Sequence, residues 1–308
     1  MNKIVAICGP TAVGKTAYSI EIAKRFDGEI VSCDSMQLYK YMDIGSAKPS
    51  PDELNQVKHH LIGIVDPSEM FSVAKYKELA SSSIDDILSR GKLPIIAGGT
   101  GLYLDALLFD LDFAAAPSDD SLRDELYKIA EEKGNLELHA ILQECDPCSA
   151  QRIHPNNVRR VVRAIESAKS GNKLKDFAKD LSLNDKYEFI LIGLRRDREE
   201  LYDRINRRVD VLVKEGLFEE VKMLREMGLS ESDISMKGIG YKEVLAYFDG
   251  EYDLETAIDT IKKNTRHFAK RQITWLKRYD DMKWFDLSES KDDKDSIREI
   301  ITWLEKSL

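Results

Sequence analysis

The sequence predicts an α/β protein, in which a P-loop-type parallel sheet is covered by helices and carries a small helical insertion domain. Apolar runs typical of buried strands alternate with helical stretches, and this alternation favours a parallel sheet with helices on both faces. About 90 residues separate the fourth run from the fifth, which is far longer than an ordinary connection. The expected strands are Ile4–Cys8, Glu29–Cys33, Leu61–Val65, Leu93–Ala97 and Phe189–Leu194.

The first expected strand runs into residues 9–16, Gly-Pro-Thr-Ala-Val-Gly-Lys-Thr, which match the P-loop pattern G-x-x-x-x-G-K-[ST]. Residues 17–26 have helical spacing, so strand, glycine turn and helix come in the order that a phosphate cradle needs. The N–H groups of residues 12–16 would converge on the anion, Lys15 would reach the outer phosphate, and the Thr16 hydroxyl could hold Mg²⁺. A tight turn that binds nothing is the alternative. The motif indicates a phosphate chain without specifying ATP.

The long interval between the fourth and fifth strands, residues 115–185, is charged and helical in pattern. We expect it to form the insertion domain, and residues 1–114 and 186–308 to form the core. Beyond residue 197 the chain is expected to be almost all helix, with a last edge strand at Trp284-Phe285 before a final helix. The other expected helices are Arg198–Glu215, Phe218–Met227, Tyr241–Tyr247 and Leu254–Tyr279.

Polar residues follow the second and fourth strands at the points where they end. Asp34-Ser35-Met36-Gln37 follow the second strand, and Gly98-Gly99-Thr100-Gly101 follow the fourth. Ligands of open α/β sheets bind beyond the carboxyl ends of the strands, so Asp34 and Thr100 are expected beside Lys15. Structural alternatives stay open: Asp34 could be a turn residue or hold Mg²⁺ through water, Thr100 could cap the helix at 102–108, and Gln37 could be a surface residue.

Asp66 follows the expected strand Leu61–Val65 and is a candidate for the strand-end aspartate of a nucleotidase or kinase. It precedes Pro67, however, and could simply begin a loop. No acidic residue follows the fourth strand. Use of ATP is therefore disfavoured but not excluded.

The composition, with 33% charged and 43% apolar residues among 308, is that of a globular protein with one large domain and a smaller one. No apolar run approaches the roughly 20 residues of a membrane span. The chain enters its first strand without a signal peptide, so we expect a cytoplasmic protein.

Four cysteines are too few for a disulfide framework in a chain of this length. Cys145 and Cys148 form a CxxC pair, but a second pair or histidines at ligand spacing, which a zinc site needs, are missing. A redox motif would need a different surrounding fold. Incidental cysteines on a helical segment are the favoured interpretation.

The net charge of −9 argues against a protein that coats nucleic acid, yet the basic residues gather in two segments. Either segment alone could be a solvated helix face, but two of them on a phosphate-binding protein favour a polyanionic partner. Residues 151–175 carry Arg152, Arg159, Arg160, Arg163, Lys169, Lys173 and Lys175, and residues 262–278 carry Lys262, Lys263, Arg266, Lys270, Arg271, Lys277 and Arg278.

Taken together, these motifs closely resemble the bacterial tRNA dimethylallyltransferases. The resemblance covers nearly the whole chain, in order and at family spacing, although the CxxC pair is not part of the family pattern. It rests on GPTAVGKT, SCDSMQLYKYMDIGSAKP, HHLIGIVDP, GGTGLYLDAL, RIHPNNVRRVVRAIE, LYDRINRRVD, KGIGYKEV and TRHFAKRQITWLKRY.

The resemblance implies transfer of a dimethylallyl group from dimethylallyl diphosphate to N6 of adenosine 37, in tRNAs that read codons beginning with U. It also implies that the P-loop holds the diphosphate, that ATP is not used, and that the insertion domain grips the anticodon stem-loop. Because the adenine amine is a poor nucleophile it needs a base, for which Asp34 is the candidate. Lys15, the P-loop and Mg²⁺ at Thr16 would stabilise the leaving diphosphate, with Thr100 near the reacting oxygen or orienting Asp34.

The resemblance also assigns residues to each substrate. The catalytic residues are Asp34, Thr100 and Lys15. The dimethylallyl diphosphate residues are Gly9, Pro10, Thr11, Ala12, Val13, Gly14, Lys15 and Thr16. The tRNA residues are Asp34, Ser35, Met36, Gln37, Thr100, Arg123, Gln151, Arg152, Arg159, Arg160, Lys237, Gly238, Ile239, Gly240, Tyr241, Lys242, Lys270 and Arg271. Arg204, Arg207 and Arg208 could reach the diphosphate or form surface salt bridges.

Three rival functions stay open at this point. A P-loop small-molecule kinase would bind ATP, but a clear second acidic metal site is missing. A prenyltransferase acting on free AMP, ADP or ATP would share the site but would not need two basic segments. A non-catalytic tRNA-binding module would not need Asp34 and Thr100 beside an intact P-loop. We expect a monomer.

Overall fold

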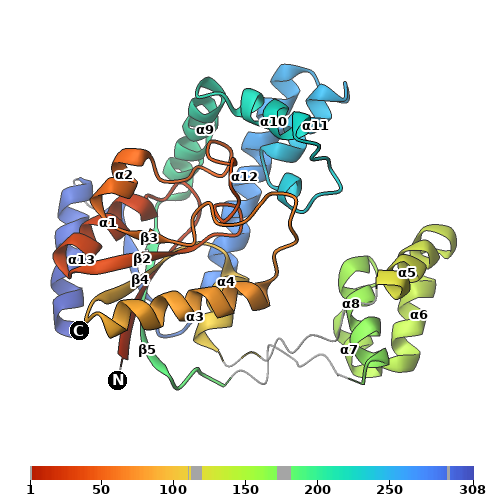
Figure 1. Ribbon diagram of the computed structural model, residues 1–308, viewed down its shortest axis with the longest axis horizontal. Helices are drawn as coiled ribbons and strands as arrows, with labels where there is room; N and C mark the ends of the chain where they lie inside the picture. The colour runs from red at the N-terminus through yellow and green to blue at the C-terminus, as the bar shows by residue number, and fades with distance from the viewer. Residues whose placement is uncertain (1, 110, 112–119, 172–181, 290–291) are drawn as a thin grey trace. The chain divides into compact units, whose positions relative to one another are not determined.

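The computed structural model describes residues 2–109, 111, 120–171, 182–289 and 292–308 (Figure 1). The chain divides into two compact units, Met1–Asp110 with Leu183–Leu308, and Leu111–Ser182. The bounds expected from the sequence, 115 and 185, differ from these by a few residues, and residue 115 lies outside the described residues. Contact of the insertion with tRNA stays a prediction.

The described part of the first unit contains a parallel sheet in the order β3-β2-β4-β1-β5-β6. Cys8 pairs with Gly98, and Gly98 pairs with Cys33, so the carboxyl ends of β1, β4 and β2 are level. The P-loop, Asp34 and Thr100 therefore begin at one edge of the sheet, as expected. The strands are β1 (Asn2–Cys8), β2 (Gly28–Cys33), β3 (His59–His60), β4 (Leu93–Gly98), β5 (Tyr187–Arg195) and β6 (Lys283–Asp286).

The strand expected at Leu61–Val65 is wrong. The strand in this region, β3, has two residues and ends before Leu61. Leu61 and Gly63 have φ angles of 62° and 61°, in the left-handed region, so the backbone cannot stay extended there. The other expected strands are present, including the edge strand at Trp284 and Phe285.

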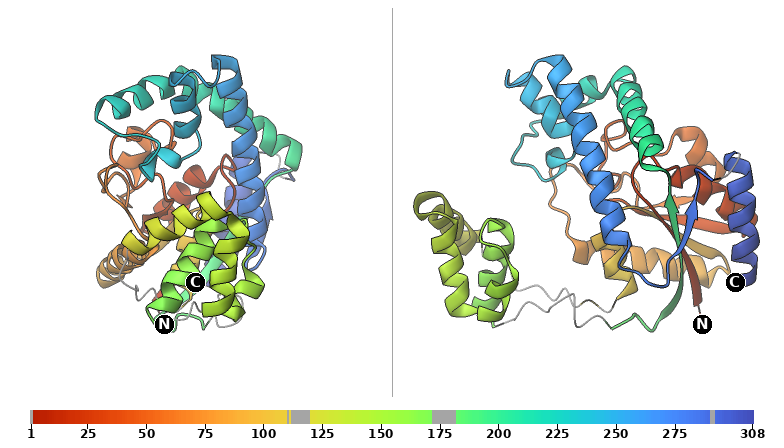
Figure 2. Two further views of the ribbon diagram at one scale, coloured as in Figure 1. Left: turned by 90° about the vertical axis from the view of Figure 1, so that its right-hand side faces the viewer. Right: turned by 180° about the vertical axis from the view of Figure 1, so that it is seen from behind.

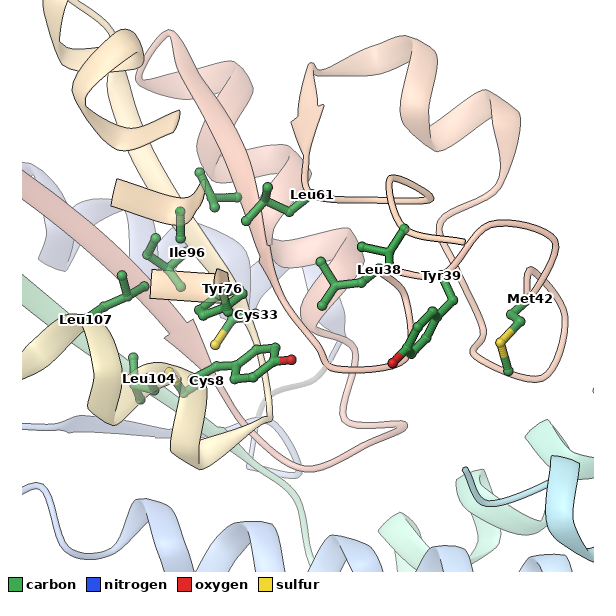
Figure 3. Packing of buried hydrophobic residues seen from close by; sticks show 14 of the residues in the cluster. Cys8, Cys33, Leu38, Tyr39, Met42, Leu61, Tyr76, Ile96, Leu104 and Leu107 are labelled. Atoms are coloured by element: carbon green, nitrogen blue, oxygen red, sulfur yellow. The ribbon is translucent and has the colours of Figure 1, made fainter. Parts of the chain in front are cut away.

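Helices cover both faces of the sheet, and the alternating side chains of β1 show the division. Ile4, Ala6 and Cys8 belong to a cluster with Tyr76 of α3 and Leu104 of α4 (Figure 3). Val5 and Ile7 belong to the other cluster, with residues of α1, α9 and α13. These helices are α1 (Lys15–Arg25), α3 (Val73–Ser89), α4 (Gly101–Leu108), α9 (Arg198–Lys214) and α13 (Asp293–Ser307).

The remaining helices of the first unit lie beyond the sheet or along it. The long helix α12 packs against α9 and α11 (Figure 2). The expected helices after residue 197 are all present, with ends that differ by a few residues. The elements are α2 (Pro51–Gln56), α10 (Leu217–Glu226), the 3₁₀ turn η1 (Ser235–Lys237), α11 (Tyr241–Phe248) and α12 (Leu254–Leu276). No described helix has the length and apolar character needed to cross a bilayer.

The second unit is helical in its described part, as its sequence pattern indicates. Among its described residues, eight buried hydrophobic side chains form a core, and these include Leu126, Leu138, Leu142 and Val161. Its helices are α5 (Asp120–Lys133), α6 (Asn135–Cys145), α7 (Pro147–Arg152) and α8 (Val158–Lys169).

Candidate active site

A cavity of about 280 Å³ lies at the carboxyl ends of the strands of the first unit. It brings the P-loop together with Asp34 and Gln37, which the sequence places after β2. It also includes residues of the loop after β2, of α9 and of α12. Its lining includes Thr11, Ala12, Gly14, Lys15, Thr16, Asp34, Gln37, Ser46, Ala47, Lys48, Glu53, His59, Arg208, Phe268 and Gln272.

The P-loop backbone is arranged with carbonyls facing basic side chains. Ala12 and Gly14 have φ angles of 63° and 117°, so the chain turns sharply before α1 begins at Lys15. The Ala12 carbonyl accepts a hydrogen bond from Arg204 Nε at 3.0 Å, and the Val13 carbonyl accepts one from Arg196 Nε at 3.1 Å. In a trans peptide the N–H points opposite to the C=O. The Gly14 N–H, which follows the Val13 carbonyl, therefore points away from Arg196 and suits a cradle for an anion, whereas the Val13 N–H donates to the Pro10 carbonyl at 3.4 Å.

Lys15 lies inside this loop. Its Nζ donates to the carbonyls of Gly9 at 3.0 Å and Pro10 at 2.9 Å. Burial lowers the pKa of Lys15 from 10.5 to about 8, while the nearby Asp34 carboxylate offsets part of this effect. A bound anion would raise this pKa again, because its negative charge stabilises the ammonium group.

Asp34 forms a turn and keeps one oxygen available. Its Oδ1 accepts hydrogen bonds from the backbone N–H groups of Met36 at 2.8 Å and Gln37 at 3.4 Å. Within the described residues, Oδ2 has no hydrogen-bond partner. The turn role that the sequence left open is thus real, and it fixes the carboxylate while leaving its second oxygen for a proton or a ligand.

Thr100 is tied to the same turn. Its Oγ1 accepts a hydrogen bond from the N–H of Ser35 at 3.1 Å, and its own N–H donates to the Cys33 carbonyl at 3.2 Å. Thr100 stands at the N-cap position of α4, but its side chain makes no capping bond to that helix. Its hydroxyl therefore connects the ends of β2 and β4 and still has a proton to donate.

The Gln37 amide is engaged at both ends. Its Oε1 accepts from Ser32 Oγ at 3.1 Å, and its Nε2 donates to the Ala47 carbonyl at 3.2 Å. Gln37 is therefore a fixed group of the cavity wall rather than a free surface residue. One N–H of the amide is left for a ligand.

Among the three arginines left open by the sequence, only Arg208 lines the cavity, where its guanidinium donates to the Ala47 carbonyl at 3.3 Å. Burial lowers the pKa of Arg208, and Asp34 acts against this. Arg204 supports the P-loop from outside, as described above, and Arg207 forms a surface ion pair with Asp203.

Gln272 of α12 contributes to the site although the sequence did not single it out. Its Oε1 accepts from the N–H of Thr11 at 2.8 Å, and its Nε2 donates to the Gly99 carbonyl at 3.0 Å. It thus joins the start of the P-loop to the loop after β4. Its position in the basic segment 262–278 and in the motif TRHFAKRQITWLKRY were the signals that could have pointed to it.

Asp66 takes no part in the cavity. Its Oδ1 accepts from the N–H and the hydroxyl of Ser68, at 3.0 Å and 2.6 Å. It begins a turn, which was the alternative to a strand-end metal ligand.

The residues expected to contact tRNA are split between the two units. In the first unit, Met36 packs closely against Gly238, so the turn after β2 and the turn before α11 are neighbours. The basic side chains expected there, Lys237, Lys242, Lys270 and Arg271, are exposed, and Ile239 and Gly240 complete the turn.

Tyr241 is placed differently from the expectation. Its side chain is completely buried, and its hydroxyl donates to Glu220 at 2.8 Å. Direct contact of this side chain with tRNA does not fit the structure, because the ring fills the core between α10 and the loop after β2.

In the second unit, Gln151, Arg152, Arg159 and Arg160 are exposed. Arg123 forms an ion pair with the buried Glu166, at 2.9 Å from Nε to Oε1, and Arg163 pairs with the same carboxylate. Lys173 and Lys175 lie outside the described residues. Cys145 and Cys148 are free and exposed.

The described residues contain no group of three His, Cys, Asp or Glu side chains that could hold a metal ion. A metal ion held by protein side chains of these types alone therefore has no site there. Thr16 and Asp34 both line the cavity, however. Mg²⁺ commonly takes one or two protein ligands and completes its shell with phosphate oxygens and water. The hydroxyl and carboxylate therefore fit Mg²⁺ that arrives with a diphosphate.

The fold and site define a P-loop-type protein in which Lys15, Thr16 and Asp34 line one cavity at the carboxyl ends of the strands, whereas Thr100 is not among the lining residues. The sequence model of the IPP transferase family matches residues 37–279, and the chain belongs to this family. The tRNA dimethylallyltransferase of Clostridioides difficile is 50% identical over 310 residues, covering 100% of both chains.

Solved structures agree with this assignment. The tRNA isopentenylpyrophosphate transferase of Bacillus halodurans has a TM-score of 0.76 at 45% identity, over 99% of this chain and 96% of that one. A eukaryotic dimethylallyltransferase, studied crystallographically acting on tRNA, has a TM-score of 0.84 at 28% identity, over 100% of this chain and 80% of that one.

Proposed function

We propose that this protein transfers the dimethylallyl group of dimethylallyl diphosphate to N6 of adenosine 37 in tRNAs that read codons beginning with U. The products are N6-(dimethylallyl)adenosine in the tRNA and diphosphate. Membership of the family and the names of its relatives support the reaction. The observation that carries the chemistry is the position of Asp34, with a free Oδ2, in the cavity that the P-loop lines.

The adenine amine is a weak nucleophile because its lone pair is delocalised into the ring. As N6 forms its bond to C1 of the dimethylallyl group, the C1–O bond to diphosphate breaks. We assign Oδ2 of Asp34 as the acceptor of the N6 proton. The two hydrogen bonds to Oδ1 hold the carboxylate in place for this step.

The leaving diphosphate gains negative charge as the C–O bond breaks. The P-loop N–H groups, Lys15 and Arg208 would stabilise that charge in the cavity. Mg²⁺ held by Thr16 would neutralise a further part of it. The hydroxyl of Thr100 keeps the Asp34 turn in register with β4.

The tRNA substrate would supply the target base from outside its stack, as base-modifying enzymes require. The remaining N–H of Gln37 suits an acceptor on the adenine edge. Exposed basic residues of both units would bind the phosphates of the anticodon stem-loop. A tRNA substrate also agrees with a cytoplasmic location.

Labelled dimethylallyl diphosphate, incubated with the protein and unmodified tRNA, tests this proposal. Parallel reactions replace tRNA with AMP, or the prenyl donor with ATP. Label in tRNA alone supports the proposal. Label in AMP would assign a free-nucleotide prenyltransferase, and phosphoryl transfer from ATP would assign a kinase.

A further inference from the structure

A buried carboxylate outside the cavity holds the loop that forms one of its walls. Glu220 of α10 accepts hydrogen bonds from three consecutive backbone N–H groups, those of Asp43 and Ile44 at 2.7 Å and that of Gly45 at 2.9 Å. Glu220 is only 8% exposed. Three aligned donors satisfy a buried carboxylate, so the loop and the charge stabilise each other.

Tyr241 completes this arrangement. Its hydroxyl donates to Oε1 of Glu220 at 2.8 Å, and its ring packs against the backbone of Gly45. A Cβ at position 45 would lie 2.5 Å from the ring, so the contact is possible only with glycine. Burial raises the pKa of Tyr241, and the Glu220 carboxylate adds to the effect, so the hydroxyl stays a donor.

The loop leads directly to Ala47, whose carbonyl is a junction in the cavity wall. That carbonyl accepts from Nε2 of Gln37 at 3.2 Å and from the guanidinium of Arg208 at 3.3 Å. Ala47 has a φ of 49°, in the left-handed region that is unfavourable for alanine. This conformation must be maintained by the surrounding contacts, and Glu220 anchors the loop two residues earlier.

We propose that Glu220 and Tyr241 are positioning residues, which fix the loop 43–47 so that the Ala47 carbonyl orients Gln37 and Arg208 in the active site. The proposal deepens the proposed function and rests on it. It gives the buried Tyr241, which the family resemblance placed among the tRNA contacts, a role through the loop instead.

The experiment compares Glu220→Gln and Tyr241→Phe with a matched control. Glutamine loses acceptor capacity toward the three N–H groups, and phenylalanine loses one hydrogen bond while keeping the ring. The control is Tyr187→Phe, because Tyr187 is also buried and its hydroxyl donates to a carboxylate, that of Asp85, at 2.7 Å. Tyr187 begins β5, at the opposite end of the strands from the cavity.

We expect kcat/KM for dimethylallyl diphosphate to fall about tenfold or more in Glu220→Gln and by a smaller factor in Tyr241→Phe, since slightly misplaced groups lose much of their effect. The kcat/KM of Tyr187→Phe should stay within about twofold of the wild-type value. Melting temperatures show whether each variant is folded. If Glu220→Gln does not fold, Tyr241→Phe and Gly45→Ala test the same loop.

A double-mutant cycle separates positioning from general stability. If Glu220 acts through Gln37 and Arg208, adding Glu220→Gln to a variant that carries Gln37→Ala and Arg208→Ala should cause little further loss in kcat/KM. The proposal is wrong if Glu220→Gln reduces kcat/KM by the same factor in this background as in the wild-type protein. It is also wrong if Glu220→Gln lowers the melting temperature but leaves the kinetic constants unchanged.

Binding of inorganic pyrophosphate keeps this test independent of the proposed function. Glu220→Gln should weaken pyrophosphate binding even if the wild-type protein transfers no label to tRNA. Wild-type inactivity would count against the proposed function, whereas unchanged pyrophosphate affinity in Glu220→Gln would count against the positioning role.

Discussion

Thr100 accepts a hydrogen bond from the N–H of Ser35 at 3.1 Å, and this bond joins the end of β4 to the turn that holds Asp34. The two residues are 65 positions apart in the sequence and meet because β2 and β4 are paired to their last residues. A threonine at a helix start would ordinarily cap its own helix. Here the hydroxyl serves the active-site turn instead.

Thr100→Val should therefore reduce transfer to tRNA by about tenfold or more, because the isosteric side chain leaves the Ser35 N–H without its acceptor and the Asp34 turn without its support. Thr100→Ser keeps the hydroxyl and should retain most of the activity. Single-turnover rates measure both variants. Equal rates for Thr100→Val and wild type would remove Thr100 from the mechanism.

Asp34→Asn should reduce transfer by about 100-fold or more, since an amide cannot accept the N6 proton. The amide oxygen can still accept from Met36, so the turn and the affinity for tRNA should be preserved. Asp66→Asn is a matched control, because Asp66 also accepts from the N–H two residues on but lies outside the cavity. Retention of more than about a tenth of the wild-type rate in Asp34→Asn would contradict its assignment as base.

The sequence predicts the strand ends well because local signals and sheet topology agree there. The P-loop pattern fixes a turn between β1 and α1, and parallel strands bring Asp34 and Thr100 to the same edge. A short apolar run was misleading only at Leu61–Val65, where two residues with positive φ follow β3. Periodicity cannot report such backbone angles.

The sequence gives much weaker signals for residues that enter the site from distant elements. Arg208 and Gln272 reach the cavity from α9 and α12, and only tertiary packing brings them there. Arg204, Arg207 and Arg208 look alike in the sequence, yet they support the P-loop, form a surface pair and line the cavity, respectively. The side chain of Tyr241 is buried and donates to Glu220, which is 21 residues away in the sequence.

The lowered pKa of Lys15 predicts a pH dependence for binding the prenyl donor. Burial brings this pKa to about 8, so the free enzyme loses the ammonium charge as the pH rises through that value. We expect kcat/KM for dimethylallyl diphosphate to fall above pH 8, since this constant reports ionisation in the free enzyme. Lys15→Arg stays charged across pH 7–9, so its profile, scaled to its own maximum, should be flat. If the scaled pH profiles of Lys15→Arg and the wild-type protein have the same shape, Lys15 is not the titrating group.

Glu29 supplies a stability prediction away from the chemistry. Hydrogen bonds from Arg90, and then from His60, lower the pKa of the buried Glu29 carboxyl from 4.5 to about 2. The ionised form is thus favoured in the folded state. The ionised Glu29 carboxylate therefore contributes fully to folding stability above its ordinary pKa of 4.5, and this contribution is lost as the pH falls toward about 2.

Glu29→Gln should therefore lower the free energy of unfolding by about 2 kcal/mol at pH 7, and by less as the pH is reduced below 4.5. Urea unfolding followed by tryptophan fluorescence measures this, because Trp275, Trp284 and Trp303 all lie in the first unit. Glu78→Gln, which breaks an exposed pair with Lys75, should change stability by less than about 0.5 kcal/mol. If Glu29→Gln lowers the free energy of unfolding by the same amount at every pH, the ion-pair explanation is wrong.

Binding of tRNA should depend steeply on salt although the protein carries a net charge of −9. Each phosphate neutralised by Lys or Arg releases counterions, so log affinity falls linearly with log salt. Replacing the exposed pair Arg159 and Arg160, or Lys270 and Arg271, with Ala should weaken binding and flatten the slope by about one unit per lost contact. Lys294 and Lys306, exposed on the acidic helix α13, provide a control double variant whose slope should match wild type. Titrations of tRNA at several salt concentrations measure all three double variants beside wild type. An unchanged slope in both basic double variants would mean that these residues are ordinary solvated surface, and that tRNA binds elsewhere on the protein.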